Sequence, residues 1–322
     1  CNNNLLDTYQ LKLQNAVLDA EVREIRREGN QYAVTLAYTH AHSEVETLLY
    51  DRVITCTGFR FDHSIFGAGC QPELRSCGRL PAMTSEWESK NIPGLFFAGT
   101  IMQYRDYKKY MSAFIHGYRY NVQTLSRMLE QRYHDTPWPS RAVARSAPEL
   151  MEALLARANK SSALWQQPGF LCDALQLDAS PSSAEYYEEL PVDYVRESRF
   201  GSGRWLMLTL EFGMVKGDPF SIERIHRTDA QHASESVFLH PIVRYSSDGQ
   251  LVAEHHVIED LAAVWDESEH RDPLAEFVSE VLSGRIAFGR GAAAVRASGL
   301  YSTDGTGAAG AEPALAAREA AR

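Results

Sequence analysis

Two short apolar stretches each end in a threonine–glycine pair, and these pairs are the residues best suited to hold a cofactor. The stretch DRVITCTGF contains Thr57 and Gly58, and the stretch GLFFAGT ends at Gly99 and Thr100. In an open parallel sheet, ligands bind just beyond the carboxyl ends of the strands. Glycine has no Cβ, so a cofactor can approach the backbone closely there. The two pairs predict a ligand site, although glycine-ended strands of a sheet without a cofactor give the same pattern.

A helix is predicted after the second stretch, from Ser112 to about Arg132. Apolar residues recur there at three- and four-residue spacing, which is typical of one apolar helix face: Phe114, Ile115, Tyr118, Val122, Leu125 and Leu129. Ser112 is suited to cap the first turn. The unpaired amide groups and partial positive charge of a helix N-terminus suit a phosphate or an anionic reduced flavin. Lys108 and Lys109 either add positive charge nearby or are simply solvated.

These elements predict an α/β fold. The segments DRVITCTG and LFFAGT are expected to be buried strands of a parallel sheet, and residues 20–39 are expected to form a hairpin that turns at Gly29 and Asn30. The C-terminal part is expected to be a mixed α/β region, with residues 177–191 as a loop. Its predicted helices and strands are helix 147–165, strands 204–213, 236–246 and 250–261, and helix 272–284, with a hairpin turn at 247–249.

Composition narrows the classes of partner. The chain has 322 residues, 44% of them hydrophobic, with a formal net charge of −10 and a pI of about 5.6. An acidic chain without an Arg/Lys stripe does not suit a nucleic acid. No apolar run reaches the roughly 18 residues that a membrane span needs. Nucleic acid and membrane insertion are therefore not expected.

Cysteine and histidine spacing predicts no metal site. None of the five cysteines forms a C-x-x-C pair, but Cys70 and Cys77 flank a loop and are either a redox pair or two unrelated thiols. His116 is either a proton donor near a flavin or a core or interface histidine. His255 and His256 are expected to point to opposite sides of a strand, one buried and one exposed, which argues against joint ligation of a metal.

The motifs resemble those of a known family. DRVITCTGF is similar to an element of the flavin monooxygenases and related two-dinucleotide-binding flavoproteins, at which the chain returns from the NAD(P)-binding domain to the FAD-binding domain. GLFFAGT resembles the last strand of their FAD-binding domain. The segment QYRDYKKYMSAFIHGYRYNVQTL resembles a narrower group, that of FAD-dependent oxidoreductase domain-containing protein 2, the endoplasmic-reticulum flavoproteins associated with degradation. NNNLLDTYQLK and HHVIEDL are also similar to that group.

The resemblance implies part of a flavoprotein that binds FAD and uses NAD(P)H. Neither of the G-x-G-x-x-G loops that would hold the two dinucleotides is found, so the chain is expected to be a C-terminal part, inactive by itself. The implied domains are the tail of the NAD(P)-binding domain (1–50), the C-terminal part of the FAD-binding domain (51–135), a family-specific mixed α/β domain (140–290) and a disordered tail (291–322).

The resemblance also assigns roles to residues. Thr57 and Gly58 would lie near the FAD, and Gly99 would admit the ribityl and pyrophosphate groups. Many relatives have an aspartate where this chain has Thr100, which can bind a ribityl hydroxyl but brings no charge. The amide groups of Ser112 and Ala113 would approach the pyrimidine edge of the flavin and stabilise negative charge on the reduced ring. No catalytic side chain is identified.

The implied activity is an FAD-dependent, monooxygenase-like oxidoreductase. Its substrate would be a small molecule or a protein thiol. The resemblance further implies the endoplasmic-reticulum lumen and the machinery that degrades misfolded glycoproteins, although the chain ends in AAREAAR without a K-D-E-L-type signal. The alternative is that residues 140–290 form a non-catalytic protein-binding module attached to a flavin domain.

Overall fold

The computed structural model of the chain describes residues 18–39, 42–56, 58–107, 110–198, 200, 202–213 and 230–286. The chain divides into two compact units, 1–59 and 60–322, and each is considered by itself. The four domain ranges predicted above stay predictions. Thr57, Lys108, Lys109 and the predicted tail 291–322 lie outside the described residues.

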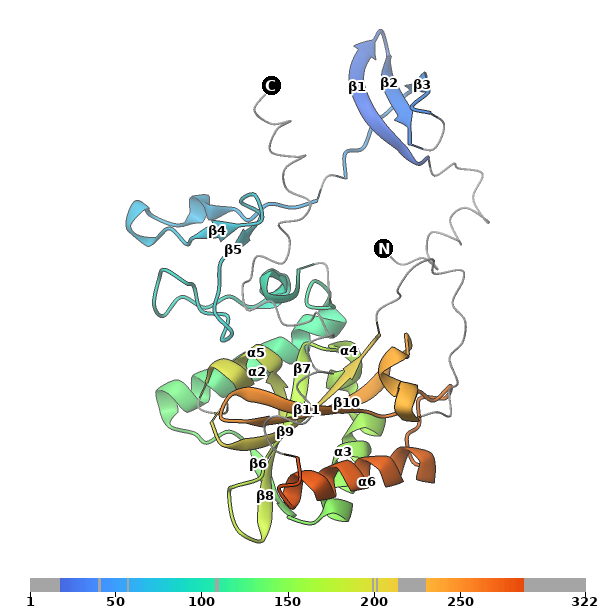
Figure 1. Ribbon diagram of the computed structural model, residues 1–322. Coiled ribbons are helices and arrows are strands. Elements are labelled where there is room, and N and C mark those ends of the chain that lie inside the picture. Colours follow the sequence, from blue (N-terminus) through green and yellow to red (C-terminus); the bar gives the residue numbers. More distant parts are fainter. Residues whose placement is uncertain are drawn as a thin grey trace. The chain divides into compact units, whose positions relative to one another are not determined.

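The first unit is a three-stranded antiparallel sheet in the order β1-β2-β3 (Figure 1). Its strands are β1 (Ala20–Glu28), β2 (Gln31–Tyr38) and β3 (Val45–Tyr50). Gly29 turns β1 into β2 with a φ of 60°, a left-handed value that favours glycine. The predicted hairpin is therefore confirmed.

The two predicted parallel strands are absent from the described residues. Arg52–Cys56 forms no strand, and Ile54 is 85% exposed. In the second stretch, only an isolated antiparallel bridge joins Phe96 to Glu88. A buried parallel strand needs neighbours on both sides, and no described strand pairs with either stretch, so their apolar residues cannot be read as a sheet interior. Every strand pair in the described residues is antiparallel.

The second unit begins with short elements that lead to one long helix. These are η1 (His63–Ile65), η2 (Ala68–Cys70), β4 (Leu74–Arg75), β5 (Leu80–Pro81) and η3 (Gly99–Asp106), followed by α2 (Ile115–His134). The helix starts three residues after the predicted Ser112, and its N-cap is Phe114. Ser112 does not cap the helix because its hydroxyl oxygen accepts hydrogen bonds from two buried amide side chains.

The rest of this unit is built on a six-stranded antiparallel sheet in the order β11-β10-β9-β7-β8-β6 (Figure 1). The strands are β6 (Ser140–Ala144), β7 (Leu171–Gln176), β8 (Ser183–Pro191), β9 (Arg204–Glu211), β10 (His240–Ser247) and β11 (Gln250–His256). Three strands and the turn at Asp248 and Gly249 were predicted. The interpretation of 177–191 as a loop was wrong, because Ala184 and Tyr186 alternate into the core and make most of that segment strand β8.

Helices cover the sheet. They are α3 (Ala147–Lys160), α4 (Ser162–Gln166), α5 (Val192–Glu197) and α6 (Ser268–Leu282), together with the 3-10 turn η5 (Ala230–Glu235). In Figure 1, α3 and α6 pack together below the sheet, and α2 and α5 lie above it.

Helix α2 is hydrogen bonded directly to this sheet. The hydroxyl of Thr124 donates to the backbone carbonyl of Glu189 on β8, at 3.0 Å. Arg127 adds an ion pair with the Glu189 side chain, at 3.3 Å. The helix that follows the predicted cofactor strand is therefore attached to the C-terminal sheet.

Candidate flavin-binding site

Gly99 has a backbone conformation that few other residues would tolerate, and it borders open space. Its φ is 86°, in the left-handed region, where a side chain is strained. A Cβ built there would have no atom within 4 Å, so the space beside the backbone is open. Thr100, the next residue, is exposed. The backbone at Gly99 is therefore accessible to a ligand.

The start of α2 presents apolar side chains to the outside. Phe114 is 55% exposed and Ile115 is 70% exposed. The ring of His116, also exposed, stacks on Phe114 with 5.5 Å between centroids. Of the two expectations for His116, the core position is wrong, since the ring lies outside. The backbone N–H groups of Phe114 and Gly117 donate to the carbonyl oxygens of Met111 and Phe114, so the N–H groups that this helix end can offer beside the apolar surface are those of Ile115 and His116.

A buried polar network, which the sequence did not reveal, lies behind this surface. Ser112 donates its backbone N–H to Asp106 Oδ2 at 3.0 Å. The Ser112 hydroxyl oxygen accepts from Asn121 Nδ2 at 2.8 Å and from Gln167 Nε2 at 3.0 Å. All four residues are at most 2% exposed. The Ser112 amide that was predicted to face a flavin is thus bound to Asp106 in this structure.

Asp106 has an unusual electrostatic environment. Burial raises the pKa of its carboxyl group to about 6, although the hydrogen bonds from Ser112 partly oppose this rise. Its second oxygen, Oδ1, is buried and finds no hydrogen-bond partner among the described residues. Tyr110 lies nearby. Burial raises the pKa of its phenol to about 12, with a smaller contribution from the negative charge of Glu211, so the phenol stays protonated. In the sequence, Asp106 looks like one charge in a polar run, RDYKK, and nothing there signals its burial.

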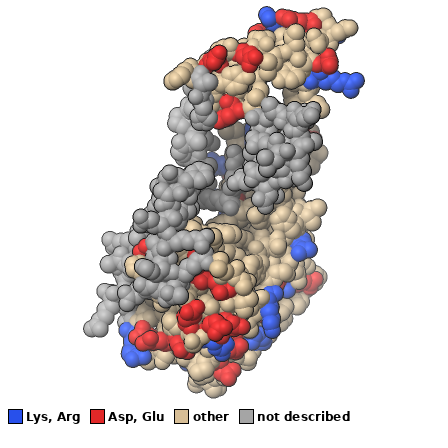
Figure 2. Space-filling view, turned by 90° about the vertical axis from the view of Figure 1, so that its right-hand side faces the viewer, with Lys and Arg blue, Asp and Glu red and all other residues tan. Residues whose placement is uncertain are grey.

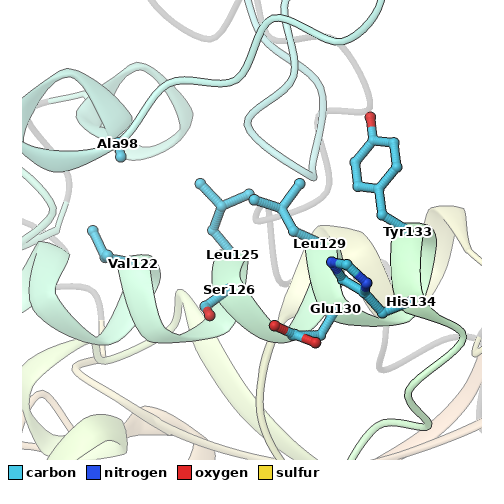
Figure 3. A pocket seen from close by; sticks show the side chains of 8 residues that line it. All are labelled: Ala98, Val122, Leu125, Ser126, Leu129, Glu130, Tyr133 and His134. Carbon is cyan, nitrogen blue, oxygen red and sulfur yellow. The ribbon is translucent and has the colours of Figure 1, made fainter.

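A shallow apolar cavity lies along α2, beside the residue that precedes Gly99. Its volume is about 350 Å³. Figure 3 shows that Ala98 lines one side and that successive turns of α2 line the other. The helix residues are Val122, Leu125, Ser126, Leu129, Glu130, Tyr133 and His134. This part of the predicted apolar helix face therefore remains partly uncovered.

The structure shows less about Gly58 and Ala113, the other predicted site residues that it describes. Gly58 has a φ of 85°, so glycine is required there by the backbone conformation. It belongs to the first unit, whereas Gly99, Thr100, Ser112 and Ala113 belong to the second. Ala113 is half-buried between Ser112 and the N-cap of α2.

The described residues form no disulfide bond and no metal-binding cluster. Cys56, Cys70, Cys77 and Cys172 are all free thiols. Within the described ranges, no group of three or more His, Cys, Asp or Glu side chains is arranged to hold a metal ion, and no helix there is both long and apolar enough to cross a membrane. Figure 2 shows acidic and basic side chains interspersed on the visible face.

One family model matches the N-terminal part of the chain. Residues 1–99 match the model of the family described as pyridine nucleotide-disulphide oxidoreductase. This match, with the mixed helices and sheets of the structure, confirms the predicted fold class: α/β, with part of a dinucleotide-binding fold followed by a mixed α/β region.

Two individual relatives share the chain's sequence far beyond that range. FAD-dependent oxidoreductase domain-containing protein 2 of Danio rerio is 30% identical over 348 aligned residues, and its namesake in Mus musculus is 28% identical over 328. Each alignment covers 87% of this chain but only 50% and 49% of the two relatives. The chain thus resembles the group that its motifs predicted and spans about half the length of these relatives. No solved structure is significantly similar to it.

The described residues fit a flavin in part. Gly99 leaves the backbone open, Thr100 supplies an exposed hydroxyl, and α2 begins beside exposed apolar side chains. The amide group of Ser112 does not fit its assigned role while Asp106 accepts its hydrogen bond. The cofactor contact is therefore better assigned to the backbone at Gly99 and to residues from Ala113 onward.

Proposed function

We propose that this chain forms the flavin-ring side of an FAD-dependent oxidoreductase that takes hydride from NAD(P)H. The observation that carries the proposal is Gly99, an open, left-handed glycine that lies before a helix whose first turn is exposed and apolar. The similarity to two proteins named as FAD-dependent oxidoreductases supports it.

The residues would act by binding and by electrostatics. The open backbone at Gly99 would admit the ribityl chain, and the Thr100 hydroxyl would hydrogen bond to a ribityl hydroxyl. Amide groups at the start of α2, with Ala113, would favour negative charge on the reduced ring. Bound FAD would supply hydride and electron transfer. The greater part of the NAD(P)H site would lie outside this chain.

The proposal for the electron acceptor rests on the resemblance to the flavoprotein family. A monooxygenase-like reaction would use oxygen and a small-molecule substrate. A protein-thiol reaction would need a redox pair, and Cys70 and Cys77 are the two thiols proposed for it. Both thiols are free in the structure, Cys77 exposed and Cys70 half-buried. The exposure of Cys77 is the feature that favours testing this branch.

A spectroscopic experiment on the natural full-length protein tests the proposal. The purified protein should show the two-peak visible absorption of bound flavin, and anaerobic NADPH or NADH should bleach it. The faster nucleotide identifies the hydride donor. Absence of flavin from well-folded protein would refute the proposal. The 322-residue chain alone is expected to retain no flavin and to show no NAD(P)H oxidation.

The cellular role is also proposed on resemblance alone. We propose that the protein acts in the endoplasmic-reticulum lumen, in quality control and degradation of misfolded glycoproteins. Protease protection of the tagged, full-length protein in isolated microsomes tests the compartment. A protein fully digested by protease without detergent would contradict it.

A second candidate is a protein-binding module in residues 140–290. This region builds a six-stranded sheet, whose core also includes earlier residues such as Trp87, Met102 and Leu125, and it lies outside the 1–99 range that matches the oxidoreductase family. Affinity capture with full-length protein tests this function. Partners that bind equally to flavin-loaded and flavin-free protein would support the module, and partners that need flavin would argue against it.

A further inference from the structure

A buried carboxylate lies at the start of helix α2, and the binding and electrostatics proposed above do not use it. Asp106 is the last residue of η3, and its Oδ2 accepts the backbone N–H of Ser112 at 3.0 Å. Ser112 lies two residues before Phe114, the N-cap of α2. Asp106 is 2% exposed, and its Oδ1 finds no hydrogen-bond partner among the described residues. A carboxyl group is therefore buried at the helix end that is proposed to face the flavin.

Close contacts hold the loop that joins this carboxylate to α2. A Cβ added to Gly117 would lie 2.0 Å from the backbone carbonyl oxygen of Met111, so the loop packs directly on the helix and only glycine fits there. A Cβ added to Gly169 would lie 2.8 Å from the Tyr110 hydroxyl, so the loop also packs on the segment that follows α4. Contacts on both sides thus keep Asp106 at the start of α2.

Asp106 is the unpaired charge of this region. Two other carboxylates lie within electrostatic range of the same loop, and each is paired. Asp193 forms an ion pair with Arg105 of η3, and Glu211 forms one with Arg244 of β10. In the part of the chain that the structure describes, no lysine, arginine or histidine forms an ion pair with Asp106. Its negative charge is therefore opposed chiefly by hydrogen bonds and by the partial positive charge of the helix end.

The same helix end carries the N–H groups that could bind a ligand. They are the backbone N–H groups of Ile115 and His116, which donate to no carbonyl oxygen among the described residues. Burial raises the pKa of Asp106 to about 6, and hydrogen bonds from Ser112 partly oppose the rise. The group is thus mostly ionised above about pH 7. Two negative groups, the Asp106 carboxylate and an anionic reduced flavin, would then share one positive helix end.

We propose that Asp106 is a positioning residue that fixes the start of α2 through Ser112 and lowers the reduction potential of the bound flavin. Two-electron reduction with uptake of one proton leaves one negative charge on a ring that was neutral. The Asp106 charge opposes that new charge and has little effect on the neutral ring. It therefore favours the oxidised cofactor over the reduced one. This role rests on the proposed flavin site.

The expected size of the effect follows from Coulomb's law. At a separation of about 10 Å and an effective dielectric constant of about 20, one unit charge changes an equilibrium constant by about tenfold. Removing the charge of Asp106 should therefore raise the ratio of reduced to oxidised flavin about tenfold at a fixed solution potential. For a two-electron couple, this corresponds to a midpoint potential about 30 mV more positive.

Equilibrium reduction of the natural full-length protein against a dye of known potential, at about pH 7.5, measures this ratio. Asp106→Asn removes the charge and keeps an oxygen that can accept the Ser112 amide, so a purely structural role would leave the potential unchanged. Glu130→Gln is the matched control, because it removes one exposed negative charge from α2. Glu130 lies 15 residues after Ile115, about 22 Å along the helix, so its loss should not move the potential.

The possible results separate this role from the proposed function. Equal potentials in flavin-loaded wild type and Asp106→Asn would overturn the role of Asp106 and leave the proposed function intact. Folded wild-type protein without flavin would refute the proposed function, and the role of Asp106 with it. An equal rise in Asp106→Asn and Glu130→Gln would show an effect of net charge and would also overturn the role.

A measurement on the wild type decides the question if Asp106→Asn does not fold or retain flavin. Coupling between two sites is reciprocal, so reduction of the flavin should raise the proton affinity of Asp106 about tenfold. Redox-induced infrared difference spectra at about pH 6.5 should show a protonated carboxyl signal that grows on reduction and shifts when aspartate is labelled with carbon-13. A reduction spectrum without such an aspartate signal would overturn the proposal.

Discussion

Replacing Asp106 with asparagine should stabilise the chain at neutral pH. The carboxyl group is 2% exposed, and burial raises its pKa from 3.8 to about 6. A shift of about two units corresponds to a penalty of about 3 kcal/mol for keeping the group charged in the folded state. Asparagine removes the charge, and its carbonyl oxygen can still accept the Ser112 amide. Asp106→Asn should therefore raise the free energy of unfolding at pH 7 by up to about 3 kcal/mol.

The sign of the pH dependence follows from the same shift. The folded chain binds the Asp106 proton more tightly than the unfolded chain does. Stability therefore falls as pH rises from about 4 to about 6, and the full penalty applies above that range. Asp106→Asn should flatten the profile in that interval.

Urea unfolding followed by tryptophan fluorescence, at several values between about pH 4.5 and pH 7.5, measures both effects. Asp178→Asn is the control with opposite sign, because the hydrogen bond from Arg204 lowers the pKa of Asp178, and so its loss should destabilise the chain at neutral pH. The reasoning would be refuted if Asp106→Asn were no more stable than wild type at pH 7 and kept the wild-type slope.

Three further outcomes are expected. Gly99→Ala should lower the flavin content of the full-length protein, whereas Gly94→Ala should leave it unchanged. Both glycines have left-handed φ values, 86° and 81°, and open space at the Cβ, so both substitutions carry about the same strain of 1–2 kcal/mol, and equal flavin content would count against a cofactor at Gly99. Asp173→Ala should lower the free energy of unfolding by about 1–3 kcal/mol, because it leaves the buried phenol of Tyr186 without its acceptor and removes one partner of the half-buried Arg157; a loss under about 1 kcal/mol in urea unfolding would contradict this. Replacing Cys70 and Cys77 together with serine should abolish NAD(P)H-dependent disulfide reduction by the full-length protein if the thiol branch is correct, and unchanged reduction would exclude that branch.

The C-terminal sheet was largely accessible from the sequence because its strands carry their own signals. Strands β9, β10 and β11 are dense in apolar and β-branched residues, and Asp248 and Gly249 make a recognisable turn. β8 was missed because glutamates occupy its outward positions and made the segment look like a linker. β6 and β7 were not predicted because each is too short to show alternation.

The candidate site was less accessible, because burial of single polar residues depends on distant segments. Gly99 could be singled out from its place after an apolar run. Asp106, Ser112 and Asn121 could not be linked in advance, because Gln167, which joins them, is 46 residues beyond Asn121. The two supposed parallel strands were wrong in the described residues because an apolar run alone reports neither burial nor which strand would be the neighbour. His255 and His256 do lie on opposite faces as predicted, but both are half-buried.

Helix α2 belongs by sequence to the predicted flavin half of the chain, yet its hydrogen bonds join it to Glu189 on β8 and to Gln167 at the end of α4. Helix α2 is therefore packed into both regions, which the sequence alone would suggest are separable. Cutting the chain between residues 135 and 140 would leave buried amide and carbonyl groups without partners on both sides of the cut.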